Sequence, residues 1–91
     1  MNKQDYREVL GQRLKEFREI RNITVYAAAK KGGIRIDQIQ SVESGESNYT
    51  IDTFLGYIVG CNLYMYFAEK AKDGDFKSLL DEAINSNPNP E

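Results

Sequence analysis

Apolar residues recur every three or four positions in two long segments of the chain. In the first segment they predict a helix from about Asp5 to Asn22, and Ile20 and Ile23 extend its apolar stripe. In the second they predict a helix from about Ile51 to Gly60, with Thr50 as its N-cap. The two stripes consist of Val9, Leu10, Leu14 and Phe17, and of Phe54, Leu55, Ile58 and Val59.

The stretch between these helices, from Thr24 to Gly45, has the pattern of two short helices joined by a tight turn. Thr24 is suited to cap the first, and the small residues at 27–29 let another helix cross closely over it. Gly33 can take the positive φ of a sharp turn. Ile34 then fills the apolar space between the two helices.

The second short helix is expected to have an inward and an outward face. Ile39 and Val42 lie three positions apart and point into the core. The outward face consists of Ile36, Asp37, Gln40, Ser41 and Ser44. Arg35 stands at the capping position without an acceptor group, so an alternative is a capping box at positions 37 and 40. The helix would then start two residues later and Ile36 would leave the outward face.

The apolar period changes to two after residue 62. A strand is predicted because large side chains alternate through Leu63, Tyr64, Met65, Tyr66 and Phe67. No other segment looks like a strand, so we expect this one to pair with its copy in a homodimer. The alternative is a fifth amphipathic helix. The predicted organisation is a mainly α domain at 1–68 with a dimerisation strand at 63–68, an extension with a short helix at 69–84, and a disordered tail at 85–91.

Composition limits the functions that remain. The chain has 91 residues, 41% of them hydrophobic and 29% charged, which is typical of one small globular domain. Its longest apolar run, 57–67, is too short to cross a bilayer, and its start is charged throughout. One cysteine, Cys61, and no histidine leave no usual zinc site and no nucleophile–base pair. We therefore expect a cytoplasmic protein without metal, cofactor or enzymatic activity, with Cys61 in the core.

Charge is divided unevenly between the two parts of the chain. The formal net charge is −2, yet residues 1–35 hold nine Lys and Arg against four Asp and Glu, whereas residues 36–91 hold three against ten. Affinity for DNA comes largely from neutralising phosphates, so the basic part is the one suited to nucleic acid. The alternative is that both parts are solvated surfaces of opposite sign.

The outward face carries side chains that can read base edges in a major groove. Gln40 can pair with adenine N6 and N7, and Ser41 can bond several base edges. Ile36 can pack on a thymine methyl group, and Asp37 can accept from a cytosine amino group. Phosphate contacts are expected from polar and cationic residues near the helix ends, namely Thr24, Lys30, Arg35, Ser44, Ser47, Asn48 and Tyr49. These features predict double-stranded DNA as the partner, and the alternative for each residue is a solvated surface position.

The residues between Leu10 and about Phe67 resemble a known family, the phage-repressor (Cro-like, XRE) helix-turn-helix proteins. The matching positions are Gly11, Arg18, Ala28, Ala29, Gly33, Ile39, Val42, Glu43 and Gly45. The resemblance implies a five-helix-type repressor-like fold and a partly buried ion pair between Arg18 and Glu43. It also implies a transcriptional regulator, a repressor, that binds two-fold symmetric operators as a homodimer.

The C-terminal layout is similar to that of HipB-like antitoxins. A helix at about 51–60, a short aromatic strand and a polar acidic tail follow one another in the same order. The resemblance implies a dimer whose strands pair between subunits, and which both represses its own operon and holds a toxin. The alternative function is therefore an antitoxin or protein-interaction module that uses the helix-turn-helix as a scaffold or for autoregulation.

Overall fold

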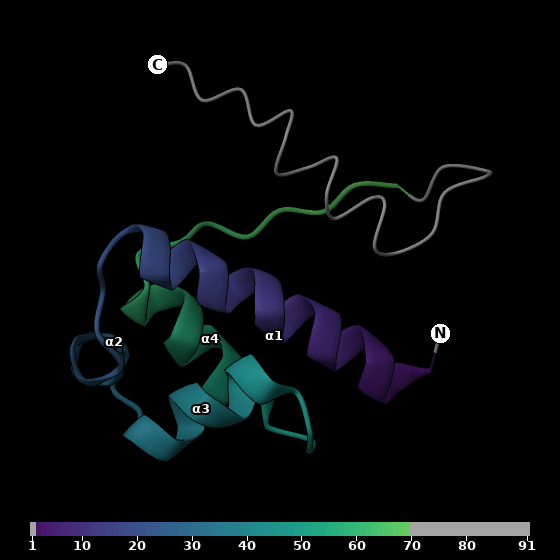
Figure 1. The fold of residues 1–91 in the computed structure, drawn as a ribbon, viewed down its shortest axis with the longest axis horizontal. Helices are drawn as coiled ribbons and strands as arrows, with labels where there is room; N and C mark the ends of the chain where they lie inside the picture. Colours follow the sequence, from purple (N-terminus) through teal and green to yellow (C-terminus); the bar gives the residue numbers. More distant parts are fainter. Residues whose placement is uncertain (1, 70–91) are drawn as a thin grey trace.

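The computed structural model describes residues 2–69, which fold into four helices (Figure 1). They are α1 (Lys3–Ile20), α2 (Val25–Gly32), α3 (Ile36–Ser44) and α4 (Ile51–Gly60). No strand is formed within residues 2–69. The expectation of a mainly α domain is confirmed. The short helix and the tail expected after residue 69 lie outside the described residues.

Helix α1 begins two residues before its expected start. The side chain of Asn2 accepts a hydrogen bond from the backbone N–H of Asp5 at 2.8 Å, which caps the helix. Leu14 and Arg18 are buried, but Ile20 is 78% exposed. Each residue turns the helix by about 100°, so Ile20 points away from the side that Leu14 buries. Including Ile20 in the buried stripe was therefore wrong.

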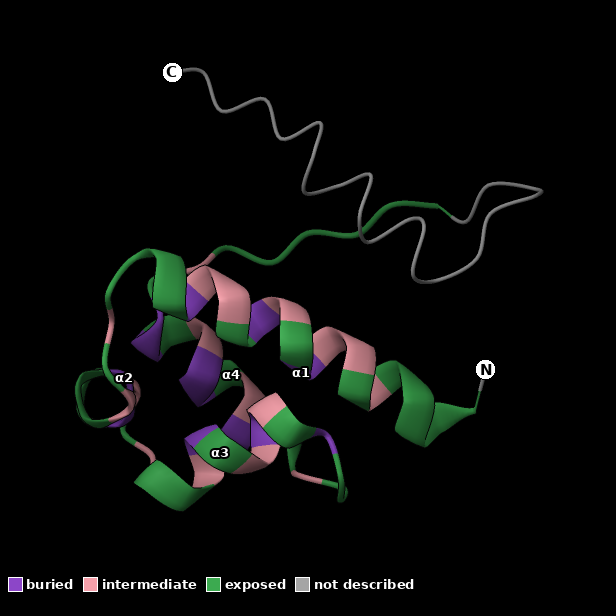
Figure 2. Ribbon diagram, in the orientation of Figure 1, coloured by how far each residue is buried: buried purple, intermediate pink, exposed green. Residues whose placement is uncertain are grey.

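Helix α3 is the central element, because it contacts the other three. It packs against α1, α2 and α4, while α2 packs most extensively against α4. Buried positions lie on the helix faces that are directed toward one another (Figure 2). The buried apolar residues are Leu14, Ala28, Ala29, Ile39, Val42, Tyr57 and Cys61. The inward direction of the two α3 residues and the core position of Cys61 are confirmed.

Small residues let α2 and α4 approach until their backbones touch. A Cβ added at Gly60 would collide with the backbone carbonyl of Ala28, and one added at Gly32 would collide with that of Gly56. The small run in α2 does admit a closely crossing helix, as expected. That helix is α4, whose two glycines are spaced four residues apart on one face.

The turn between α2 and α3 has the predicted geometry. Thr24 caps α2 by accepting a hydrogen bond from the N–H of Ala27 at 3.0 Å. Gly33 ends α2 with φ +69°, the left-handed conformation that a residue without a Cβ adopts at least cost. Ile34 follows, half-buried against the core.

Residues 63–69 continue from α4 as an extended trace that is neither helix nor strand (Figure 1). Leu63 is half-buried, whereas Tyr64 is 98% and Phe67 86% exposed. The alternative of a fifth amphipathic helix is not found in this segment. Within a single chain the expected strand has no partner to supply its hydrogen bonds, and none is formed.

Candidate nucleic-acid interface

The outward face of α3 is presented as the periodicity predicts. Ile36, Asp37, Gln40 and Ser44 are exposed, and Ser41 is half-buried. On the opposite side, Ile39 and Val42 have no exposed surface. Burial of these two residues fixes the rotation of α3 about its axis, so four of the five outward residues face solvent together.

Helix α3 starts at Ile36, which overturns the alternative start two residues later. Arg35 is the N-cap residue in extended conformation, and its side chain has no acceptor to offer the helix. Gln38 supplies the cap instead: its Oε1 accepts a hydrogen bond from the backbone N–H of Arg35 at 2.8 Å. Ile36 therefore stays on the outward face, in the first turn of the helix.

An exposed ion pair lies at this first turn. Arg35 Nε is 3.0 Å from Asp37 Oδ1, and the two side chains are 71% and 70% exposed. Such a pair is worth at most about 1 kcal/mol because water and salt screen it. Its effect on the surface is that Arg35 offsets the negative charge of Asp37 next to the outward face.

The candidate phosphate contacts divide into two groups in space. Thr24, Lys30 and Arg35 are exposed at the N-cap of α2, in the last turn of α2 and at the N-cap of α3, whereas Ser44, Ser47, Asn48 and Tyr49 belong to the end of α3 and the loop that leads to α4. Within the second group, Ser44 Oγ accepts from the N–H of Glu46 at 3.3 Å. The ring of Tyr49 stacks on Phe54, with centroids 6.1 Å apart, and burial raises the pKa of Tyr49. Tyr49 is thus partly a packing residue.

Arg7 holds the loop after α3, a role that sequence reasoning missed. Its Nε donates to the carbonyl oxygen of Gly45 at 3.0 Å, and its Nη1 donates to Asn48 Oδ1 at 3.0 Å. Gly45 has φ +67° and lies so close to Arg7 that a Cβ would meet the Arg7 backbone. Arg7 and Gly45 are 38 residues apart in the sequence, so no local sequence pattern predicts their contact.

A buried polar network ties α3 to α1 and α4. Glu43 Oε2 accepts from Arg18 Nε at 2.5 Å and from the Tyr57 hydroxyl at 2.5 Å, and Glu43 Oε1 accepts from Arg18 Nη2 at 3.1 Å. Arg18 Nη1 donates to the carbonyl oxygen of Ile23 at 2.8 Å. The structure thus contains the Arg18–Glu43 pair that the family resemblance implies. Tyr57 completes it and was not anticipated.

The ionisable groups of this network keep the protonation states that its hydrogen bonds require. Hydrogen bonds to Glu43 raise the pKa of Arg18, so the guanidinium stays charged. Burial, together with the hydrogen bond to Glu43, raises the pKa of Tyr57 far above its ordinary value, so its hydroxyl remains a donor. Burial also raises the pKa of Cys61, which keeps the thiol neutral.

An open cleft of about 460 Å³ lies between α1 and the C-terminal half of α3. Its lining residues are Glu8, Gln12, Lys15, Gln40, Glu43, Ser44 and Glu46. Glu43 is already paired with Arg18, which leaves the carboxylates of Glu8 and Glu46 against one lysine and makes this cleft unfavourable for phosphate. Gln40 and Ser44 of the outward face also line this cleft, so its carboxylates lie near two of the candidate DNA contacts.

Residues 2–69 contain neither a metal-binding cluster nor a helix that could span a membrane. Among these residues, no group of His, Cys, Asp and Glu is arranged to hold a metal ion. None of the four helices combines the length and the apolar character that crossing a membrane requires. Comparison of the chain with protein-family models, curated proteins and solved structures gave no match.

Proposed function

We propose that the protein is a sequence-specific DNA-binding transcriptional regulator, a repressor, in which α2 and α3 form a helix-turn-helix. The single observation that carries the proposal is the short helix α3, which buries Ile39 and Val42 and leaves Ile36, Asp37 and Gln40 together in solvent. A helix held this way can enter a major groove with its first turns toward the bases. The protein acts in the cytoplasm and needs no cofactor.

In this proposal the outward face reads bases and the two polar groups bind the backbone. Gln40 pairs with adenine, Ile36 packs on a thymine methyl group and Asp37 accepts from cytosine, while Ser41, being half-buried, reaches only a base edge close to the helix. The backbone contacts come from Thr24, Lys30, Arg35, Ser44, Ser47, Asn48 and Tyr49. The groups flank α3 from α2 and from the loop before α4.

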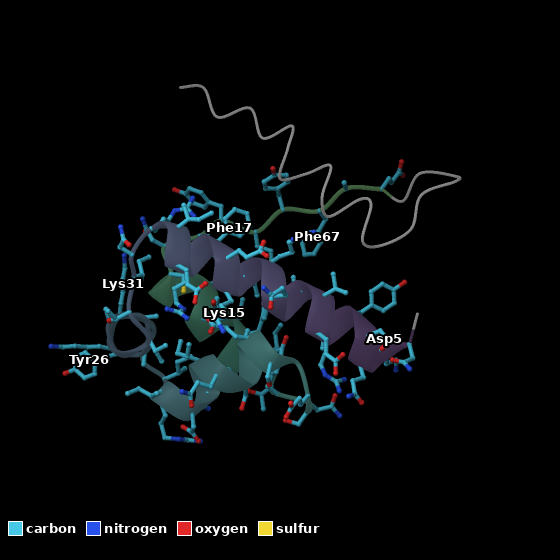
Figure 3. The ribbon with its side chains drawn as sticks, in the orientation of Figure 1. Asp5, Lys15, Phe17, Tyr26, Lys31 and Phe67 are labelled. Atoms are coloured by element: carbon cyan, nitrogen blue, oxygen red, sulfur yellow. The ribbon has the colours of Figure 1, made fainter. Side chains whose placement is uncertain are left out.

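The proposed regulator is a homodimer on a two-fold symmetric operator. Its subunits pair through residues 63–67 as antiparallel strands, which adds the C-terminal strand to the repressor-like fold. The supporting observation is the exposure of large side chains in this segment, 98% at Tyr64, 68% at Tyr66 and 86% at Phe67. Figure 3 shows Phe67 on the side of α1 away from α3, so pairing there leaves the outward face accessible.

The dimer is tested by sedimentation velocity of the variant Met65→Pro. Proline removes a backbone N–H and does not fit a paired strand, so the variant is expected to sediment as a monomer with unchanged helix content. Tyr26→Ala is the matched control, since Tyr26 is 65% exposed on α2 and projects away from the helices (Figure 3). A dimer that survives in Met65→Pro contradicts pairing through this segment.

A second candidate function is an antitoxin or protein-interaction module. The same exposed aromatic side chains, Tyr64, Tyr66 and Phe67, favour it, because aromatic residues dominate the energetics of protein interfaces. In that case the segment binds a toxin or another protein, and the helix-turn-helix serves as a scaffold or for autoregulation.

The salt dependence of binding separates the two functions. A regulator that contacts several phosphates loses DNA affinity steeply as salt rises, and it binds its own site far more tightly than a random duplex. The measurement is fluorescence anisotropy of labelled duplexes at 50 to 200 mM salt, a range chosen because such proteins lose roughly a thousandfold or more across it. A flat response, with tight binding to the product of a neighbouring gene, supports the second candidate.

A further inference from the structure

The amide of Gln38 uses both of its ends inside the protein. Its Oε1 accepts from the N–H of Arg35 at 2.8 Å, and its Nε2 donates to Thr53 Oγ1 at 3.1 Å. Thr53 is only 6% exposed, so this second bond is shielded from water. A glutamine on the surface of a short helix would ordinarily be a solvated residue, but here both ends of the amide are bonded to other parts of the protein.

The hydrogen bonds continue from Gln38 into the start of α4. Thr50 Oγ1 donates to Thr53 Oγ1 at 3.0 Å and accepts from the N–H of Thr53 at 3.1 Å, which caps α4. One chain of bonds therefore runs from Arg35 through Gln38 and Thr53 to Thr50. It connects the first turn of α3 directly to the first turn of α4.

This connection spans the two parts of the proposed DNA interface. The first turn of α3 carries Ile36 and Asp37, and the loop that ends at Thr50 carries Ser47 and Asn48. Base contacts and phosphate contacts are thus held at a fixed separation by a side chain that belongs to neither group. Arg7 holds the other end of the same loop.

We propose that Gln38 is a positioning residue that sets the register of the outward face against the phosphate-binding loop. This inference rests on the proposed function. Hydrogen bonds to base edges are short and directional, whereas attraction to phosphates is long-range and tolerates displacement. A shift of the first turn of α3 therefore weakens recognition of the correct site and leaves binding to random DNA almost unchanged.

The test compares specific with random binding in three variants. The readout is the ratio of the Kd for a random duplex to the Kd for the duplex that wild-type protein selects from a random pool, at one salt concentration. Gln38→Ala removes both bonds and should lower the ratio about tenfold, the effect of losing roughly one good base contact. Thr53→Val removes the bonds of the Thr53 hydroxyl to Gln38 and to Thr50 but keeps the bond between Gln38 and Arg35, and it should also lower the ratio.

The third variant, Gln38→Glu, distinguishes positioning from simple loss of a side chain. A carboxylate still accepts from the N–H of Arg35 and can accept from the Thr53 hydroxyl, so both connections persist. Its added charge weakens binding to every duplex alike, so the ratio should stay at the wild-type value. Gln4→Ala is the control, because Gln4 is an exposed glutamine bonded only to Glu8 on α1.

The outcomes separate this inference from the proposed function. If wild-type protein has a ratio near one, the proposed function fails and the inference fails with it. If wild-type protein discriminates and Gln38→Ala discriminates equally well, only the inference is overturned. Should Gln38→Ala lose its helical circular dichroism, Thr53→Val decides, because it keeps the cap on α3: an unchanged ratio in that variant overturns the inference.

Discussion

Replacing Tyr57 by phenylalanine removes one hydroxyl from the centre of the protein. Tyr57 has no exposed surface, and its hydroxyl donates to Glu43 Oε2. The ring fits the same space in the variant, so the perturbation is the loss of one hydrogen bond to a buried carboxylate. Arg18 still pairs with both oxygens of that carboxylate, which limits the damage.

A hydrogen bond to a charged group contributes about 1.5 to 3 kcal/mol, so Tyr57→Phe should lower the free energy of unfolding by about 2 kcal/mol. For a domain of this size that corresponds to a fall in Tm of roughly 8 to 16 °C. Urea unfolding followed by circular dichroism measures the free energy of unfolding, and thermal unfolding measures Tm. An unchanged urea m-value shows that the variant and the wild-type protein expose the same surface on unfolding.

The matched control is Tyr49→Phe, which removes a hydroxyl from a half-buried ring that stacks on Phe54. It should cost less than about 0.5 kcal/mol, as substitutions away from buried networks do. Equal, small losses in the two variants would refute the reasoning, because Glu43 would then gain nothing from the Tyr57 hydroxyl.

Three further predictions address packing, pH and base reading. Gly60→Ala should lower the free energy of unfolding by about 1 to 3 kcal/mol or more, because its Cβ collides with the Ala28 backbone, and Gly60→Asn should lower it no less. Gly33→Ala should lower it by about 1 to 2 kcal/mol because of the positive φ, and Gly33→Asn by less, since asparagine tolerates that conformation better. Thermal unfolding measures all four. The free energy of unfolding should fall above about pH 10 by about 1.4 kcal/mol per pH unit, because Tyr57 in the unfolded chain then loses a proton that its raised pKa keeps in the folded state. Urea unfolding at pH 9 to 11 should show a shallower decline for Tyr57→Phe than for the wild-type protein. An identical decline in the two contradicts this. Gln40→Ala should weaken binding at particular base pairs by about 1 to 3 kcal/mol each, and equal loss on all duplexes rejects its reading role.

Local patterns were sufficient to predict the two-helix stretch. The spacing of Ile39 and Val42 fixed which side of α3 is buried, and Gly33 marked the turn, because both depend only on neighbours in sequence. The start of α3 was harder. A glutamine three residues after the cap is the usual capping-box position, and that signal at Gln38 was available, but the arginine at the cap obscured it.

Contacts between distant helices could not be predicted in the same way. The bond from Tyr57 to Glu43 and that from Gln38 to Thr53 depend on how α4 crosses α3, which no local period encodes. Gly56 and Gly60 did offer a signal, two small residues on one helix face, that matches Ala28 and Gly32 on α2. The alternation at 63–67 predicts a strand that pairs with a second subunit, and such pairing cannot form within one chain.

Selection of bound duplexes from a random pool by the purified full-length protein tests the central proposal most directly. A homodimer that reads DNA with α3 should enrich a palindrome whose half-sites lie about one helical turn apart. Binding to the enriched duplex should exceed binding to a scrambled one by roughly a thousandfold or more at physiological salt. A pool that stays random after repeated rounds contradicts the account and leaves the outward face without the proposed partner.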